Sequence, residues 1–171
     1  MSDSETPSAP PSGGKEPDLL VLTQYVKDLS FENPNAPVIF GQTQSSPKIS
    51  ISVDVRVNAI QDRLAEVVLV LQIEAKVSDK SAFLIELDYA GIANLTREMT
   101  PEEAERAFLI DTPAMLFPFA RSIVANLSRD GGFMPFLMTP IDFDQLYQQR
   151  QSRIAEKAAA DPGESEEPSS T

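Results

Sequence analysis

The chain has 171 residues, of which 42% are hydrophobic and 23% are charged, so it can fold as one domain around its own core. It contains no cysteine and no histidine, which excludes disulfides, thiolate and imidazole metal sites, thiol catalysis and a Ser-His-Asp triad. The formal net charge of -12 argues against nucleic-acid partners, because a polyanion is bound by a basic surface.

The two ends of the chain differ in composition from its middle. Residues 1–18 and 158–171 are rich in Pro, Ser, Gly and acidic residues, with little apolar surface to offset the cost of ordering. We therefore predict a disordered N-terminal arm, a domain over residues 19–157 and a disordered acidic C-terminal tail. The longest aliphatic run, Val67 to Leu71, is far below the ~18 residues of a membrane span, so we expect a cytosolic protein that does not insert into a membrane.

Four segments in the first half have strand character. Leu19 to Leu29 is rich in β-formers and leads into a polar, proline-bearing crossover that ends at Pro47. Aliphatic and polar residues alternate over Ile49 to Asn58, which places the aliphatic ones on one face, and the pattern repeats over Leu64 to Val77 and Ser81 to Ile92. Hairpin-length connections predict that these three strands form an antiparallel meander, and the first strand joins one edge.

The second half has helical character. Thr100 and Glu103 form a capping-box pattern, and apolar residues recur at helical spacing from Leu116 to Leu127. A Gly- and Pro-bounded loop separates this segment from another helix that starts at Asp142. Strands followed by helices predict an α+β fold, in which a four-stranded antiparallel sheet has two main helices packed on one face.

Carboxylate pairs are the remaining catalytic candidates, namely Glu86 with Asp88 and Asp142 with Asp144. We interpret them as a solvated strand face and as charges at a helix N-terminus. The sequence has no phosphate-binding glycine loop and no acidic calcium loop, so we expect no enzyme, metal or cofactor. A carboxylate hydrolase stays as an alternative that would require two carboxylates buried in one pocket with raised pKa values.

Two features favour protein binding. Leu84 lies among the carboxylates of Glu86 and Asp88 on the expected solvent face of its strand, as in a docking patch. Phenylalanine and methionine are dense after the sheet, and flexible apolar side chains in a loop can line an adaptable groove, although core packing is the alternative. The candidates for such a groove are Phe117, Phe133, Met134, Phe136 and Met138.

The chain resembles the SecB family of protein-export chaperones over about residues 19–151. The resemblance is carried by KDLSFENPNAP from Lys27, SAFLIELDYAGI from Ser81, LFPFAR from Leu116 and GGFMPFLMTPIDFDQLY from Gly131. It implies a homotetramer built as a dimer of dimers in the bacterial cytosol. Such a holdase works without ATP, keeps unfolded precursor proteins translocation-competent and delivers them to the SecA motor ATPase.

The resemblance also implies roles for individual residues. The positions that match the family's motor-docking motif are Asp28, Glu32, Leu84 and Glu86. Ile85, Leu87 and Tyr89 match a stretch that affects subunit assembly in the family, and a plain core role is the alternative for them. A SecB-like chaperone that serves a toxin-antitoxin pair is a second possible function.

Overall fold

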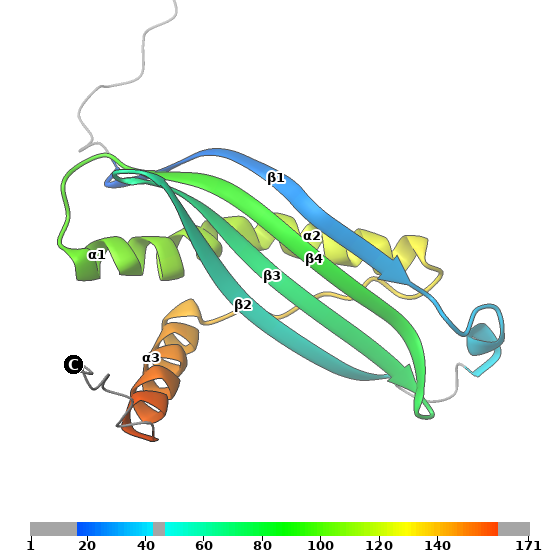
Figure 1. The fold of residues 1–171 in the computed structure, drawn as a ribbon. Helices are drawn as coiled ribbons and strands as arrows, with labels where there is room; N and C mark the ends of the chain where they lie inside the picture. The colour runs from blue at the N-terminus through cyan, green and yellow to red at the C-terminus, as the bar shows by residue number, and fades with distance from the viewer. Residues whose placement is uncertain (1–16, 43–46, 161–171) are drawn as a thin grey trace, which may run out of the picture.

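In the computed structural model, which describes residues 17–42 and 47–160, an antiparallel sheet is followed by helices (Figure 1). The predicted disordered arm and tail fall almost entirely outside these residues. The described strands pair in the order β1-β4-β3-β2. The elements are β1 Leu19–Glu32, β2 Lys48–Gln61, β3 Leu64–Val77, β4 Lys80–Leu95, α1 Pro101–Arg106, α2 Thr112–Asp130 and α3 Phe143–Ala160, with a 3-10 helix at Val38–Gln42 and a π-helical turn at Ala107–Asp111.

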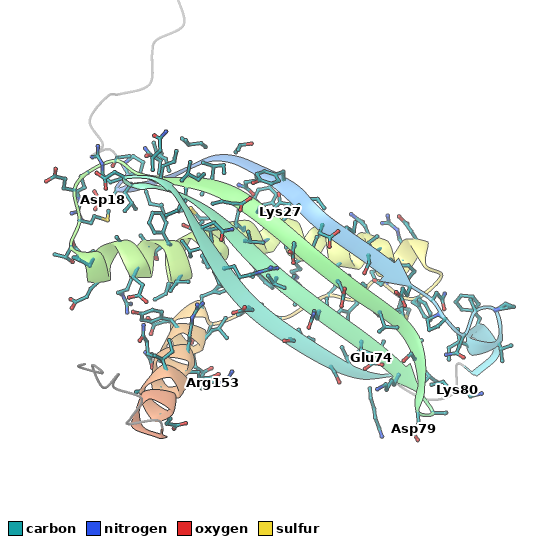
Figure 2. The ribbon with its side chains drawn as sticks, viewed as in Figure 1. Asp18, Lys27, Glu74, Asp79, Lys80 and Arg153 are labelled. Atoms are coloured by element: carbon teal, nitrogen blue, oxygen red, sulfur yellow. The ribbon has the colours of Figure 1, made fainter. Side chains whose placement is uncertain are left out.

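The predicted meander is confirmed, because β2 pairs antiparallel with β3 and β3 pairs antiparallel with β4. Tight turns join these strands, and Asp79 and Lys80 mark the β3–β4 turn at one end of the sheet (Figure 2). β1 lies at the sheet edge beside β4, as predicted. The predicted end of β1 at Leu29 is wrong, since Phe31 and Glu32 continue the pairing with β4.

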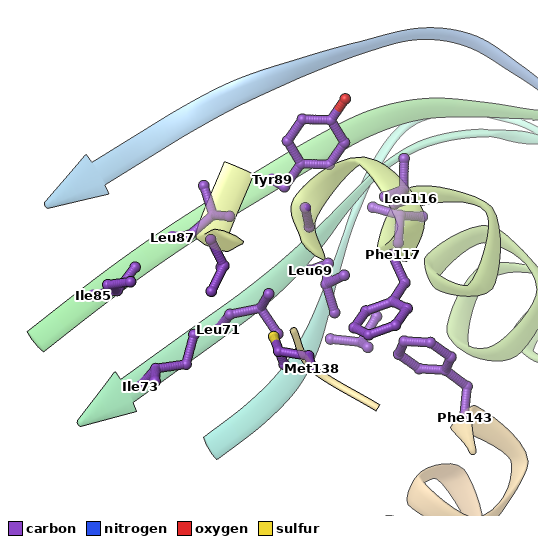
Figure 3. Packing of buried hydrophobic residues seen from close by; sticks show 14 of the residues in the cluster. Leu69, Leu71, Ile73, Ile85, Leu87, Tyr89, Leu116, Phe117, Met138 and Phe143 are labelled. Carbon is purple, nitrogen blue, oxygen red and sulfur yellow. The ribbon is translucent and has the colours of Figure 1, made fainter. Parts of the chain in front are cut away.

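One face of the sheet forms the core together with α2 (Figure 3). Leu69, Leu71 and Leu87 are fully buried there against Leu116 of α2. The backbones approach closely at Gly91 of β4, where a Cβ would lie 2.8 Å from Leu116 Cδ2. Among the described residues no helix covers the opposite face, which we call the open face.

A nearly continuous helix of 30 residues runs from α1 through the π-helical turn into α2. The predicted capping box is present: Glu103 N donates to Thr100 Oγ1 at 3.2 Å, and Thr100 N donates to Glu103 Oε2 at 2.9 Å. The helix is long and apolar enough to cross a membrane, but a core helix has the same character. Its buried Leu116 and Val124 pack against the sheet.

The second main helix, α3, extends away from the sheet beyond β2 (Figure 1). Its first residue, Phe143, is buried against Phe117, with ring centroids 6.2 Å apart. Farther along, Arg150 Nη1 donates to the β2 carbonyl of Val55 at 2.8 Å. The prediction that both helices pack on one face therefore holds for α2 and for the start of α3. Farther along α3 most of the described side chains are exposed.

Candidate functional site

An apolar groove lies where the crossover after β1 meets the loop between α2 and α3. Its volume is about 480 Å³. Among the described residues, no charged side chain lines it. Its lining, which defines the apolar groove below, comprises Ile39, Phe40, Pro47, Ile49, Val77, Ala82, Phe83, Gly132, Phe133, Met134, Pro135 and Phe136.

The SFENPNAP segment holds the walls of the apolar groove together. Asn33 Nδ2 donates to the carbonyl of Gly131 at 3.3 Å, and Asn35 Nδ2 donates to the carbonyl of Ser81 at 2.9 Å. Phe31 packs so closely on the end of α2 that a Cβ at Gly131 would clash with its ring. This segment therefore ties the end of β1 to the end of α2 and the start of β4.

Aromatic rings and a methionine give the apolar groove its chemistry. The Phe133 ring centroid lies 5.3 Å from that of Phe40 and 5.0 Å from that of Phe83. Met134 is 87% exposed. Burying exposed apolar surface is favourable and non-directional, and methionine adapts to varied shapes. The groove can therefore bind apolar side chains of an extended chain without reading a defined sequence.

The five predicted groove residues separate into two sets. Phe133, Met134 and Phe136 line the apolar groove, whereas Phe117 and Met138 are buried in the core at 6% and 2% exposure. The latter two therefore occupy core positions in the single chain. Sequence reasoning missed Phe40, whose signal is the short apolar run Val38 to Phe40 inside a polar crossover.

The open face gathers the four residues that match the docking motif. Cross-strand pairing puts Glu32 of β1 opposite Leu84 of β4, and Asp28 opposite Asp88. Residues 84, 86 and 88 share a face of β4 because side chains alternate along a strand. Asp28, Glu32, Leu84 and Glu86 thus lie together on the side away from α2, and we call them the acidic face.

Internal ion pairs occupy several basic side chains of the open face. Arg56 Nη2 lies 2.6 Å from Asp88 Oδ2, Lys27 Nζ lies 2.6 Å from Glu66 Oε2, and Lys76 Nζ lies 2.9 Å from Glu74 Oε2 (Figure 2 labels Lys27 and Glu74). In the part of the chain that the structure describes, the carboxylates Asp28, Glu32 and Glu86 have no ion-pair partner. The acidic face therefore keeps an uncompensated negative charge.

Glu66 is the centre of a separate polar cluster on the open face. Its carboxylate accepts hydrogen bonds from Lys27 Nζ, the Tyr25 hydroxyl and Asn58 Nδ2. These donors, Lys27 first, lower the pKa of Glu66 from 4.5 to about 2. The hydrogen bond to the same carboxylate raises the pKa of Tyr25. The cluster joins β1 to β2 and β3 across the sheet.

We expect Glu66→Gln to remove an acid-sensitive contribution to stability. The Glu66 pKa is lower in the folded chain than its usual 4.5, so its contribution is complete above pH 4.5 and is lost as pH falls toward 2. The free-energy difference of unfolding between the wild type and Glu66→Gln should therefore shrink over that window. Denaturant titration from pH 7 to pH 2 measures it, with the exposed Glu156→Gln as the control that should parallel the wild type. A constant difference at every pH would contradict the expectation.

The three predicted assembly residues lie inside the single chain. Ile85, Leu87 and Tyr89 are 0%, 1% and 8% exposed and belong to the core cluster. Their side chains face α2, so they do not offer a surface to a second copy. Any effect of these residues on assembly has to act through the packing of β4 against α2, and the assembly role stays a prediction.

Of the four carboxylates of the hydrolase alternative, three have structural partners and the fourth is exposed. Asp88 pairs with Arg56, and Glu86 is exposed. Asp142 caps α3 by accepting from Gln145 N at 2.9 Å, while Asp144 Oδ1 lies 2.8 Å from Arg106 Nη2. None of these four residues lies in a buried pocket. The described residues also contain no group of acidic side chains able to hold a metal ion.

Apolar side chains are exposed along β1 and the neighbouring side of α2. Val26 and Leu29 of β1 are 45% and 39% exposed on the helix side of the sheet, and Met115 and Phe119 of α2 are 46% and 52% exposed. The Phe119 ring stacks on Tyr89, with centroids 6.5 Å apart. We call Val26, Leu29, Met115 and Phe119 the apolar flank. An exposed apolar patch of this kind is typical of a protein–protein interface.

Known proteins resemble this chain over most of its length. Residues 12–154 match the family described as preprotein translocase subunit SecB. The chain is 48% identical over 147 residues to a protein-export protein SecB of Parvibaculum lavamentivorans, with 86% of this chain and 87% of that protein covered. A protein-export protein SecB of Rhodospirillum centenum is 47% identical over 132 residues, with 77% of this chain and 79% of that protein covered.

A solved structure has the same fold. It is the SecB-like chaperone of Mycobacterium tuberculosis in complex with a peptide from the HigA1 antitoxin. Its TM-score is 0.61 at 13% sequence identity, and the comparison covers 72% of this chain and 91% of that chain. At this identity the likeness establishes the fold alone.

Proposed function

The chain belongs to the SecB family of protein-export chaperones, and from this membership we propose that it is an ATP-independent holdase of the bacterial cytosol. The protein is a chaperone and not an enzyme. It binds unfolded precursor proteins, keeps them translocation-competent and delivers them to the SecA motor ATPase. The observation that carries this proposal is an uncharged aromatic groove on one side of the sheet, with an unpaired acidic face on the other.

The apolar groove binds the client. An unfolded precursor exposes the apolar side chains that a folded protein buries, so a groove lined by Phe133, Met134 and Phe136 selects unfolded chains. Each contact buries little area and exchanges quickly, which suits a chaperone that has to release its client. Release then depends on transfer to a partner rather than on nucleotide hydrolysis.

The acidic face binds the motor. Unpaired carboxylates steer a basic partner surface toward the sheet, and Leu84 supplies an apolar contact among them. Leu84 and Glu86 point away from α2, whereas the apolar groove contains the helix-side residues Ile49 and Phe83. The chaperone can therefore hold a client and contact SecA at the same time.

The chain assembles as a homotetramer, a dimer of dimers, through surfaces that include the apolar flank. Exposed Met115 and Phe119 on α2 and exposed Val26 and Leu29 on β1 form the surface that a second copy covers. Four apolar grooves on one particle raise the effective concentration of binding sites along one extended client. Avidity can then be high while each contact stays weak.

The decisive experiment is a refolding assay without nucleotide. We expect the purified chaperone to delay the spontaneous refolding of a slow-folding precursor, and ATP should not change the delay. When SecA is added, the held precursor should be transferred to membrane vesicles that contain the translocon. Sedimentation of the same sample should give about four chains per particle. Refolding at the unassisted rate would contradict the holdase proposal, and a stable monomer would contradict the assembly.

The toxin-antitoxin alternative has weaker support than export. A SecB-like chaperone solved with an antitoxin peptide shares the fold, but it is only 13% identical to this chain. The relatives at 48% and 47% identity are protein-export proteins. Export is therefore the function proposed here.

A further inference from the structure

A cleft of about 420 Å³ lies between α3 and the outer edge of the sheet, and we call it the α3 cleft. Its apolar walls come from β2, the π-helical turn and α3, and consist of Val53, Val55, Leu109, Leu146 and Ile154. Ile154 is 54% exposed although it lines the cleft. The described part of the chain therefore leaves these apolar walls open to solvent.

The α3 cleft carries positive charge in an otherwise acidic protein. Arg150 and Arg153 of α3 line it, and neither has an ion-pair partner among the described residues (Figure 2 labels Arg153). Arg150 Nη1 donates to the carbonyl of Val55, which holds its guanidinium at the edge of β2. The acidic lining residue Asp54 belongs to the open face, because side chains alternate along β2. Two arginines thus border an apolar surface.

The segment that follows α3 has the complementary charge. Residues 161–171, which lie outside the described residues, contain no basic residue, and their carboxylates belong to Asp161, Glu164, Glu166 and Glu167. The segment begins with Asp161, Pro162 and Gly163, and proline with glycine just after a helix is typical of a chain reversal. Acidic side chains therefore come directly after a turn signal, on the same chain as the two arginines.

The way back from the end of α3 to the arginines is short. Arg153 lies about 10 Å along the axis before the helix end at Ala160, at a rise of about 1.5 Å per residue. An extended chain covers about 3.3 Å per residue, so Glu164 to Glu167 can reach Arg153 and also Arg150. A tether of this length gives the acidic segment a high effective concentration at the α3 cleft, and weak contacts then suffice for docking.

We propose that residues 161–171 fold back along α3 and occupy the α3 cleft of their own chain. Glutamates of the segment pair with Arg150 and Arg153, and the segment covers the apolar walls. The same side of β2 continues from this cleft past the exposed Ile51 to Ile49 in the apolar groove. The segment therefore competes with any client that extends along β2 beyond the apolar groove, and this competition rests on the proposed function.

Paramagnetic relaxation in the full chain tests the docking. The chain has no cysteine, so a nitroxide on Ser169→Cys labels the segment at one position. At low salt the label should remove most of the intensity of the Leu109 and Val55 methyl signals, which belong to the cleft. Arg153→Glu should restore these signals, and exposed Arg153 can be replaced without loss of core packing. Lys80→Glu is the matched control, because Lys80 is exposed at the β3–β4 turn, and it should leave the intensity loss unchanged (Figure 2).

An exchange of charges completes the test. Arg153→Glu combined with Glu164→Lys and Glu166→Lys should bring the intensity loss back. Full Leu109 intensity in the labelled wild type would overturn the docking. Intensity loss that persists in Arg153→Glu would also overturn it, since proximity would then follow from the tether alone. Loss seen only between differently labelled chains of mixed particles would make the occupant the segment of a second copy.

Client titration separates the competition from the proposed function. Glu164→Gln, Glu166→Gln and Glu167→Gln together should raise the affinity for an unfolded precursor by about threefold at low salt, because the tethered competitor is weakened. The gain should disappear at high salt, which releases the wild-type segment as well. Equal affinities at low salt would overturn the competition. A wild type that binds no precursor would instead overturn the proposed function, whereas the relaxation experiment decides the docking in either case.

Discussion

Leu84→Arg is expected to weaken binding to SecA by about thirtyfold or more while client binding stays at the wild-type level. Leu84 is the apolar residue among Asp28, Glu32 and Glu86 on the acidic face. Loss of a central apolar contact typically costs about 2 kcal/mol or more of binding free energy, and the arginine also pairs with carboxylates that would otherwise contact the basic partner. The effect should lie mainly in faster dissociation, whereas Glu86→Lys should slow association, because rim charges act on the encounter rate.

The measurement is a paired titration of each variant against SecA and against an unfolded precursor. Ile60→Arg is the matched control, because Ile60 is a 49% exposed aliphatic residue near the end of β2 that lies far from Leu84. It should keep both affinities. Equal loss of both affinities in Leu84→Arg would indicate destabilisation of the fold. Unchanged SecA affinity would mean that docking uses another surface.

The sheet could be predicted largely from the sequence, because the alternation of apolar and polar residues along a strand is a local property. Ile49, Ile51, Val53 and Val55 share one face of β2, as their period of two predicts, although Ile51 is 46% exposed. The exposure of a strand residue depends on which part of the sheet the helices cover. The residue pattern of the strand does not contain this information. The end of β1 was missed for a related reason, since the pairing of Glu32 with Leu84 of β4 is a long-range contact.

The candidate sites show the same division between local and long-range information. The shared face of Leu84 and Glu86 follows from strand period, whereas their proximity to Asp28 requires the β1–β4 register. Phe133 and Met134 were predicted from a loop whose composition is unusual. Phe40 joins them only because Asn33 and Asn35 fold the crossover back onto α2 and β4.

Core residues and groove residues could not be separated by composition. Phe117 and Phe133 are the same residue type in the same half of the chain, yet Phe117 packs on Phe143 and Phe133 lines the apolar groove. The difference is tertiary, because Phe117 points from α2 toward the start of α3 while Phe133 follows the end of α2. Helical spacing identifies a buried face but does not indicate where the helix layer leaves a gap.

Met134→Asp is expected to lower affinity for unfolded precursors by about tenfold or more without changing the mass of the assembly. Met134 lines the apolar groove at 87% exposure, so its replacement removes little core packing. In the complex the aspartate would be buried against apolar client side chains, and burial of an unpaired carboxylate is costly. Binding should recover partly at low pH, where the carboxylate becomes protonated.

Leu137→Asp is the matched control for this prediction. Leu137 is 64% exposed in the same loop but does not line the apolar groove, so the same charge there should leave client affinity unchanged. Fluorescence titration with a reduced, unfolded precursor measures the affinities, and sedimentation checks the mass. Equal losses in both variants would mean that negative charge anywhere on the loop repels clients. SecA affinity should be unchanged in both variants, because the acidic face lies on the other side of the sheet. Wild-type client affinity in Met134→Asp would place client binding outside the apolar groove.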